Sequence, residues 1–274
     1  MSVLQIIKAL FQKINNVMNL KKITFPNKLE CYYISSKEET EFIFREIFIE
    51  QQHLKNGIVI KEGDCIFDVG ANIGLFPLFL NRFAQSLKIY SFEPIEPIFE
   101  VLQENMHLHS MENVLLFNYG LSSENNPEAV FSFYPNMAAN STIKPEEQLE
   151  LPEVLQSSLN LNQKQLEYFT RSSQVAGELK TLSSVIKELE IQTIDLLKID
   201  VEGAEYEVLQ GIEEKDWSKI KQIIIEVHDR QGRVEQMKKM LNGYGFDLTV
   251  EKNDLLPAEI SKVLNAYNLY ATRK

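Results

Sequence analysis

The sequence has 274 residues, of which 44% are hydrophobic and 24% charged, so it is long enough to bury the core of one globular domain. Its net charge of -11 and pI near 5.0 exclude nucleic acid and anionic membrane as main partners, and favour a neutral or cationic small molecule or a protein-tethered substrate. The two cysteines, Cys31 and Cys65, are too few for a disulfide framework or a thiolate metal site, so we expect a reducing, cytoplasmic setting.

The first 20 residues carry apolar side chains at helical spacing: Val3, Leu4, Ile7, Leu10, Phe11, Ile14 and Met18. Lysines and glutamines interrupt this pattern too often for a signal peptide or a membrane span. We expect a helix within an N-terminal helical region, residues 1–60, that packs on the core without stable membrane insertion. A helix that docks on a partner or lies on a membrane surface is the alternative.

Short apolar runs rich in β-branched and aromatic residues predict parallel strands over residues 65–70, 88–94, 114–120, 194–201 and 220–228. Helical patterns alternate with these runs at residues 75–83, 97–109, 204–210 and 233–242. Alternation of this kind predicts an α/β, doubly wound, Rossmann-like fold over residues 61–274. Residues 246–252 and 267–274 alternate apolar and polar residues, which predicts two final strands that close a seven-stranded sheet antiparallel.

Residues 124–180 interrupt the alternation of strands and helices between the third and fourth predicted strands. This segment is too long for an ordinary connection between a strand and a helix. The segment contains Phe131, Phe133 and Tyr134, followed by a helical stretch over residues 151–169. A solvated loop gains nothing from clustered aromatic side chains, so we expect an inserted lid over the active face. A mobile surface excursion is the alternative.

The first predicted strand runs into a glycine turn, DVGANIG. Gly70 permits a tight turn and close backbone approach to a ligand, and Gly74 lets the following helix pack closely. Asn72 stands where a dinucleotide fold normally has another glycine, which weakens a nicotinamide hypothesis. Asp68 would repel a pyrophosphate but suits a ligand that carries an ammonium and a sulfonium, and S-adenosyl-L-methionine is such a ligand.

The second predicted strand ends in SFEP, which places Glu93 about 20 residues beyond the turn. An acidic side chain at this place commonly binds both ribose hydroxyls of an adenosine cofactor. A helix cap or an exposed strand end is the alternative role for Glu93. At the end of the third strand, Asn118, Gly120 and Leu121 are expected to flank the adenine.

These motifs resemble a known family. DVGANIGLF, FEP, LKIDVEGAEYEVLQG and IIIEVH together are similar to the FkbM-type methyltransferases, which are class I S-adenosylmethionine-dependent enzymes, over roughly residues 33–228. FEPIEPIFEVLQENM and FYPNMAANSTIKPEE resemble the O-methyltransferases of polyketide and mixed peptide-polyketide assembly lines. The resemblance implies methylation of an aliphatic or enol hydroxyl of a secondary metabolite, either free or tethered to an acyl carrier protein.

Three other functions stay open at this point. They are methylation of another small-molecule or sugar hydroxyl, a nucleotide-dependent oxidoreductase, and a non-catalytic binding module of the same fold.

A hydroxyl acceptor needs a general base, and a histidine suits this role at neutral pH. Of the four histidines, His228 stands at the carboxyl end of a central strand, where ligands bind. We expect His107 and His109 to be surface or packing residues, and His53 lies in a polar run. The resemblance implies that Glu202, the glutamate of DVEG, accompanies the histidine. A structural role for His228 is the alternative.

The remaining polar candidates lie on the strand ends and in the insertion. Asp200 is assigned to the cofactor, whereas Glu205 and Glu207 suit the first turn of a helix, where its dipole stabilises carboxylates. We expect that the reaction requires no metal ion. The alternative is a metal site formed by Asp200, Glu202, Glu226 and His228, although oxygen ligands with one imidazole are a poor to moderate match for magnesium or manganese. In the insertion, Tyr134, Asn136 and Asn140 are candidates for orienting the acceptor, or ordinary turn formers.

Overall fold

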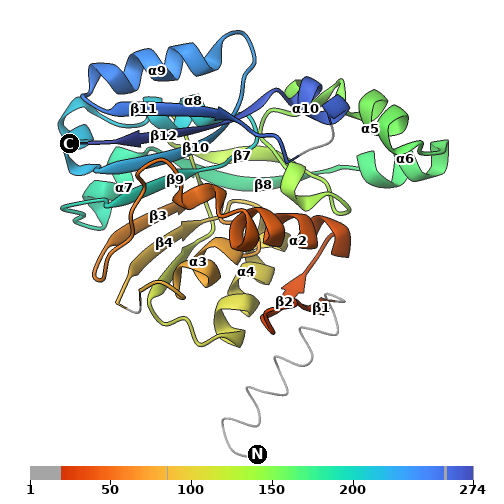
Figure 1. Ribbon diagram of the computed structural model, residues 1–274, viewed down its shortest axis with the longest axis horizontal. Coiled ribbons are helices and arrows are strands. Elements are labelled where there is room, and N and C mark those ends of the chain that lie inside the picture. The colour runs from red at the N-terminus through yellow and green to blue at the C-terminus, as the bar shows by residue number, and fades with distance from the viewer. Residues whose placement is uncertain (1–19, 85, 256–257, 274) are drawn as a thin grey trace, which may run out of the picture.

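The protein is described by a computed structural model that covers residues 20–84, 86–255 and 258–273. Its centre is a seven-stranded sheet (Figure 1). In spatial order the strands are β11 (Asp247–Lys252), β12 (Ala266–Thr272), β10 (Gln222–His228), β9 (Leu196–Ile199), β3 (Cys65–Val69), β4 (Lys88–Phe92) and β5 (Val114–Phe117). The predicted helix of the first 20 residues falls almost wholly on residues 1–19, which lie outside the described part of the chain.

Strand directions confirm the α/β doubly wound prediction. The pairs β4–β5, β3–β4, β3–β9 and β9–β10 are parallel, whereas β12 pairs antiparallel with both β10 and β11. The mostly parallel sheet with an antiparallel C-terminal strand, β12, is therefore confirmed, and β11, which pairs antiparallel with β12, points the same way as β10. A polar-apolar alternation predicts a half-exposed strand but not its direction.

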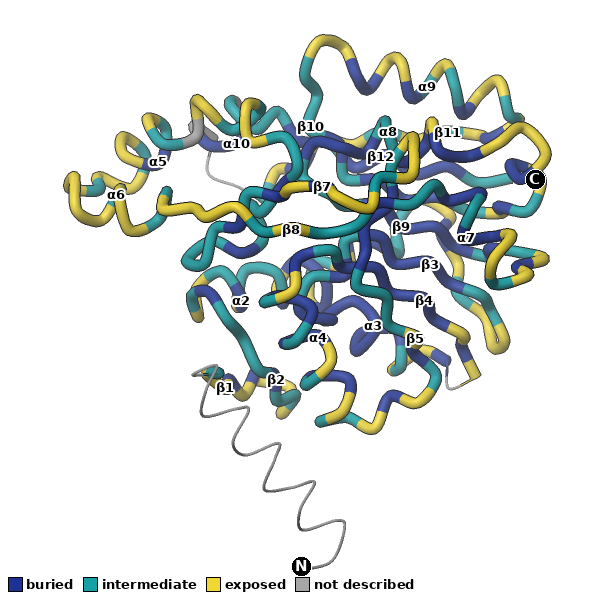
Figure 2. The backbone as a smooth tube through the Cα atoms, turned by 180° about the vertical axis from the view of Figure 1, so that it is seen from behind, coloured by how far each residue is buried: buried dark blue, intermediate teal, exposed yellow. Residues whose placement is uncertain are grey.

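Helices cover both faces of the sheet, as the strand-helix alternation predicts. One core contains side chains of α2 (Lys37–Phe44), α3 (Leu75–Leu80) and α4 (Glu96–Leu108). The other contains side chains of α7 (Leu182–Glu188), α8 (Glu205–Gln210) and α9 (Arg233–Gly243), with the short helix η5 (Glu214–Lys219). Figure 2 shows the consequence, since β3, β4 and β9 are buried while α9 exposes its outer side.

Several strand residues whose side chains lie on the face of the sheet that packs against α3 are polar. Side chains alternate along a strand, so Asp68, between Phe67 and Val69 of the α9-side core, faces α3. Lys198 and Glu226 face the same way, since the apolar residues beside them also belong to the α9-side core. The register pairs Asp68 with Lys198. One face of the sheet therefore becomes polar toward the carboxyl ends of its strands.

The insertion after β5 is built around a second, three-stranded sheet of β6 (Gly120–Leu121), β8 (Ser173–Lys180) and β7 (Asn126–Phe133). Beyond β7 lie η3 (Ala138–Asn140), η4 (Pro145–Gln148), α5 (Leu151–Leu159) and α6 (Gln163–Thr170). The predicted helical stretch is two helices, because Asn160 adopts a left-handed conformation that ends α5 and Asn162 caps α6. In Figure 1 these helices extend to one side of the sheet, next to α10 (Ala258–Leu264).

The described N-terminal residues are not purely helical. A two-stranded hairpin, β1 (Lys21–Thr24) and β2 (Glu30–Tyr33), precedes α2, and its short polar strands give little sequence signal. After α2 come a π-helical turn, η1 (Arg45–Ile49), and a 3-10 turn, η2 (Gln52–Leu54). Isolated π turns occur frequently at functional sites.

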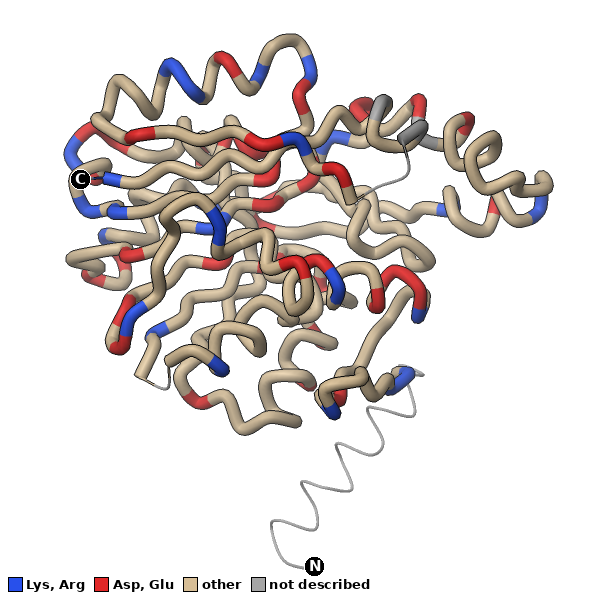
Figure 3. The backbone as a smooth tube through the Cα atoms, viewed as in Figure 1, with Lys and Arg blue, Asp and Glu red and all other residues tan. Residues whose placement is uncertain are grey.

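Charged residues are distributed over the whole fold, and basic and acidic positions are interspersed along the chain (Figure 3). Among the described helices, none has the length and apolar character required to cross a membrane.

Candidate active site

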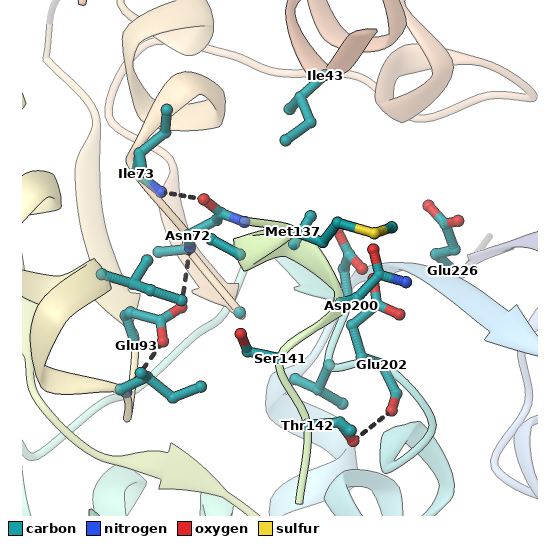
Figure 4. Close-up of a pocket in the computed structure, with 18 of the residues that line it drawn as sticks. Ile43, Asn72, Ile73, Glu93, Met137, Ser141, Thr142, Asp200, Glu202 and Glu226 are labelled. Atoms are coloured by element: carbon teal, nitrogen blue, oxygen red, sulfur yellow. Dashed lines mark hydrogen bonds between the residues drawn. The ribbon is translucent and has the colours of Figure 1, made fainter. Parts of the chain in front are cut away.

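A cavity of about 350 Å³ opens at the carboxyl ends of the parallel strands. Its floor is formed by residues at or just beyond the carboxyl ends of β3, β4, β9 and β10, and its cover comes from α2, η1 and the loop after β7. Figure 4 shows Asn72 and Glu93 on one side, Asp200, Glu202 and Glu226 on the other, Met137 between them and Ile43 above them. This is where a doubly wound sheet binds its ligands.

The glycine turn holds the floor of the cavity in a conformation that other residues tolerate poorly. Gly70 has φ +80°, and a Cβ atom there would lie 1.7 Å from the backbone oxygen of Asp200. Gly74 has φ +88°, and a Cβ atom there would lie 2.6 Å from side-chain atoms of Leu102 and Met106 in α4. Gly70 thus brings β3 and β9 together, and Gly74 permits the close helix packing expected of it.

Glu93 lies at the end of β4 and lines the cavity. Its carboxyl group accepts hydrogen bonds from the backbone N–H groups of Asn72 at 3.1 Å and Ile95 at 3.0 Å. Burial raises the pKa of Glu93 to about 7. The carboxyl group is therefore fixed beside the glycine turn, in the place predicted for ribose recognition.

The residues expected at the adenine divide into two groups. Gly120 and Leu121 line the cavity. Asn118 does not, and its side-chain amide donates instead to the carboxylate of Glu96. The prediction for Asn118 therefore does not fit this structure, because the residue lies just past β5 with its side chain turned toward α4.

Asp68 does not contact the cavity, although it was expected to face the ligand. It is fully buried beneath the glycine turn, outside the cavity lining, and pairs with Lys198 Nζ at 3.1 Å. Lys198 Nζ also donates to the carbonyl oxygen of Gly70 at 2.8 Å and lies 3.4 Å from Asp200. Asp68 therefore does not face a ligand directly, but positions the lysine that holds the turn.

His228 and Glu202 come together on the cavity wall, on the same side of the sheet edge as Gly70 and Asn72. The distance from His228 Nδ1 to the nearer Glu202 carboxylate oxygen is 3.8 Å, longer than a hydrogen bond. Burial lowers the pKa of His228 and raises that of Glu202 well above its ordinary value. The imidazole is therefore neutral at pH 7 and able to accept a proton.

Glu202 has a backbone conformation that is unusual for its type, with φ +55°, and the next residue, Gly203, has φ +103°. The Glu202 carbonyl oxygen accepts a hydrogen bond from Thr142 Oγ1 at 2.7 Å. Such strained positions concentrate at functional sites. The insertion thus contacts the backbone that carries the predicted partner of His228.

Asp200 and Glu226 line the cavity as well, and Glu205 and Glu207 occupy the first turn of α8, as predicted. Among the described residues, no group of three or more His, Cys, Asp and Glu side chains has the arrangement of a metal site.

Of the insertion residues proposed for the acceptor, Asn140 lines the cavity, whereas Tyr134 and Asn136 do not. The Asn136 amide donates to the carbonyl oxygen of Tyr168 at 2.8 Å, so it joins the loop to α6. Much of the remaining wall is apolar, and its members include Phe42, Ile43, Met137, Leu155, Leu159 and Ile260.

Four titratable residues of the cavity were not predicted as site residues: Glu39, Glu46, His53 and Lys198. The sequence did mark Lys198 as unusual, because it is a charged residue inside the apolar run LLKID. Nothing in the sequence pattern indicated that His53 and Glu46 would be buried, since their burial depends on how η1 and η2 fold over the sheet.

A family model, "Methyltransferase FkbM domain", matches residues 68–248, about two thirds of the sequence. The chain belongs to the FkbM methyltransferase family. This membership confirms the resemblance and, with it, S-adenosyl-L-methionine as the cofactor; it also excludes the oxidoreductase alternative.

Relatives of this FkbM-family protein that match over most of their length are named as methyltransferases. The chain is 35% identical over 243 residues to "Methyltransferase sdnD" of Sordaria araneosa, covering 85% of this chain and 92% of the relative. It is 31% identical over 243 residues to "31-O-demethyl-FK506 methyltransferase FkbM" of Streptomyces tacrolimicus, covering 86% and 92%. A crystal structure of an FkbM methyltransferase from Methylobacillus flagellatus KT superposes with a TM-score of 0.51 at 11% identity, over 79% of this chain and 45% of that one, which shows the shared fold.

Proposed function

We propose that this FkbM-family enzyme methylates a hydroxyl oxygen of a polyketide or mixed peptide-polyketide intermediate, with His228 as general base. The observation that carries the proposal is the position of His228, which lines one cavity with the glycine turn and with Glu93. The apolar wall suits a hydrocarbon-rich acceptor better than a sugar, whose hydroxyls would meet few partners there. The name of the Streptomyces relative refers to methylation at oxygen, which agrees with a hydroxyl acceptor.

The residues at the cavity floor fit the cofactor. Glu93 would hold the ribose hydroxyls, the backbone at Gly70 and Asn72 would approach the ligand closely, and Asp200 adds negative charge where a cationic ligand is expected. When bound, S-adenosylmethionine supplies a methyl group on a positively charged sulfur. Acidic side chains around it favour that charge over a neutral or anionic ligand.

In the proposed reaction, His228 takes the hydroxyl proton as the oxygen-carbon bond forms and the sulfur-carbon bond breaks. The sulfur keeps the bonding electron pair, and the products are a methyl ether and S-adenosylhomocysteine. Glu202, at 3.8 Å, lies where its carboxyl group stabilises the imidazolium that results. The apolar cover excludes water from the reacting groups, and the enzyme's largest contribution is to hold them in line.

The acceptor reaches the cavity either free or on an acyl carrier protein, and the insertion over residues 124–180 acts as the lid that covers it. Mass spectrometry of 3-hydroxyacyl carrier proteins and of the matching free thioesters, each incubated with a labelled methyl donor, decides between the two. The free thiols of Cys31 and Cys65 suit the cytoplasmic setting that we propose.

The variant His228→Gln tests the base. It is expected to bind S-adenosylhomocysteine within about twofold of wild type and to lose at least about 100-fold in turnover, the usual scale for a lost general base. His109→Gln is the matched control, since His109 contacts the backbone of Glu30 away from the cavity. Unchanged turnover of His228→Gln would contradict the role, and would return His228 to a structural or non-catalytic interpretation.

A further inference from the structure

A carboxylate of the insertion reaches the loop that carries His228. Glu147 belongs to η4, and both of its carboxylate oxygens accept hydrogen bonds from the guanidinium of Arg233, at 2.5 and 2.9 Å. Arg233 is the first residue of α9, and it also donates to the backbone carbonyl oxygen of His228 at 3.1 Å. The side chains of Arg233 and Glu147 are 11% and 18% exposed, so water screens this bidentate pair only weakly. Two successive contacts therefore join the insertion to the residue proposed as the base.

The same carboxylate lies against the loop that carries Glu202. Gly203 follows Glu202, and a Cβ atom at Gly203 would lie 2.8 Å from a carboxylate oxygen of Glu147. Gly203 also has φ +103°, a conformation that suits glycine and few other residues. Thr142, earlier in the insertion, donates to the Glu202 carbonyl oxygen at 2.7 Å (Figure 4). The insertion therefore contacts both of the strand-end loops that carry the proposed catalytic pair.

The separation of His228 and Glu202 depends on how these two loops are held. Their side chains approach to 3.8 Å, which is longer than a hydrogen bond, so the contact between them does not fix their positions. Both loops contain residues at positive φ, with Glu202 at +55°, Gln231 at +55° and Gly232 at +75°. Strained backbone persists only where the surrounding structure holds it in place. Glu147 supplies such contacts to both loops.

The charges of this ion pair also act on His228. Burial opposes the ionisation of Glu147, but the hydrogen bonds and charge of Arg233 outweigh it and lower the pKa of Glu147. Burial is the largest influence on His228 and lowers its pKa; negative charge at Glu147 opposes this effect, and positive charge at Arg233 reinforces it. The charged groups that face the imidazole are Asp200, Glu202, Glu147, Arg230 and Arg233. Glu147 therefore offsets a positive charge that would otherwise disfavour protonation of the base.

We propose that Glu147 and Arg233 are positioning residues for methyl transfer, through which the insertion holds the loops of His228 and Glu202 and offsets the positive charge beside the base. This inference rests on the proposed function, in which His228 is the base. Neither Glu147 nor Arg233 lines the cavity, so both act through other residues and not by contact with a ligand. The insertion is then a part of the catalytic apparatus as well as a lid.

The variant Glu147→Gln tests the proposal, because glutamine keeps the shape of the side chain and removes its charge. Glu150→Gln is the matched control, since Glu150 pairs with Arg230 across the same two segments at 3.2 Å but is 69% exposed. Turnover of 3-hydroxyacyl thioesters is measured with a labelled methyl donor and expressed per S-adenosylhomocysteine-binding site, counted by isothermal titration. Glu147→Gln should lose at least about tenfold in kcat and keep the Kd for S-adenosylhomocysteine and the acceptor KM within about threefold, whereas Glu150→Gln should keep all three within about twofold.

The double variant with His228→Gln separates positioning from a structural role. A residue that acts through the base has nothing left to position once the base is removed, so the double variant should turn over within about twofold of His228→Gln alone. A carboxylate that only stabilises the fold or closes the lid would cost the same factor in both backgrounds. Multiplied losses, an unchanged kcat for Glu147→Gln, or an equal loss in Glu150→Gln would each overturn the proposal.

Hydrogen-deuterium exchange of the protein saturated with S-adenosylhomocysteine adds a test that needs no acceptor. Glu147→Gln should raise exchange in residues 200–206 and 228–234, and Glu150→Gln should not; unchanged exchange in both segments overturns the proposal. If Glu147→Gln does not fold, Arg233→Lys replaces it with the same expectations, since lysine keeps the charge but not the bidentate geometry. Wild-type turnover of His228→Gln would instead refute the proposed base, so the two failures are distinguishable.

Discussion

Replacement of Lys198 by methionine tests the electrostatics beneath the glycine turn. The Lys198 side chain is 5% exposed and the Asp68 side chain 0%, and their charged atoms are 3.1 Å apart. Methionine keeps an apolar stem of similar length but leaves Asp68 with a single long contact, to Ser91 Oγ at 3.5 Å. Removing one partner of a buried pair costs about 3–5 kcal/mol. Such a loss is a large fraction of the roughly 5–15 kcal/mol that stabilises a typical domain.

Urea unfolding of Lys198→Met, Asp68→Asn and the double variant measures this coupling. The double variant should recover most of the loss, since it leaves no uncompensated buried charge. Lys221→Met is the matched control, because Lys221 is 61% exposed and its pair with Asp195 should contribute less than about 1 kcal/mol. A loss below about 1 kcal/mol for Lys198→Met, or no recovery in the double variant, would refute the assignment of Lys198 as the residue that neutralises Asp68.

Two further substitutions test the turn and the buried imidazole. Gly70→Ala places a Cβ atom 1.7 Å from the Asp200 carbonyl oxygen at φ +80°, so we expect a loss of at least about 2 kcal/mol in urea unfolding, and an unchanged midpoint would contradict it. For His53, the folded pKa of about 3 lies below the unfolded value of about 6.5, so the unfolded state binds more protons between these values and stability falls as pH falls. Unfolding at pH 7, 6 and 5 should show His53→Gln losing less stability with acid than wild type, by up to about 1.4 kcal/mol per pH unit; parallel curves would count against a neutral buried imidazole.

The sequence was sufficient for the features that depend on local pattern. Buried parallel strands are continuous apolar runs, so β3, β4, β9 and β10 were predictable. The residues at their carboxyl ends, Glu93 and His228 among others, meet at one sheet edge for topological reasons. The direction of β11 and the contacts of Asn118 were not predictable. Both depend on pairing partners that lie far away in the sequence.

Asp68 shows why adjacency to a motif does not define a contact. Its place in DVGANIG suggested a ligand carboxylate, but strand alternation points it below the turn, and the register with β9 sets it beside Lys198. The lysine was visible in the run LLKID, yet its partner depended on which strand lies next to β3. His53 and Glu46 are the opposite case, because ordinary polar residues become buried only when the N-terminal segment folds over the sheet.

The cavity is lined by many carboxyl groups, but burial opposes their ionisation. Burial raises the pKa of most of its lining carboxyl groups: Glu39, Glu46, Glu93, Glu202 and Glu226. These groups therefore hold protons more readily than exposed carboxyl groups, which limits the repulsion among them. A ligand that brings positive charge favours the ionised form of these groups, so the cavity becomes more negative as a cation binds, although the loss of their protons offsets part of the attraction. Methyl transfer removes the charge on sulfur, so the same carboxyl groups should favour the methyl donor over its product and assist release once the reaction is complete.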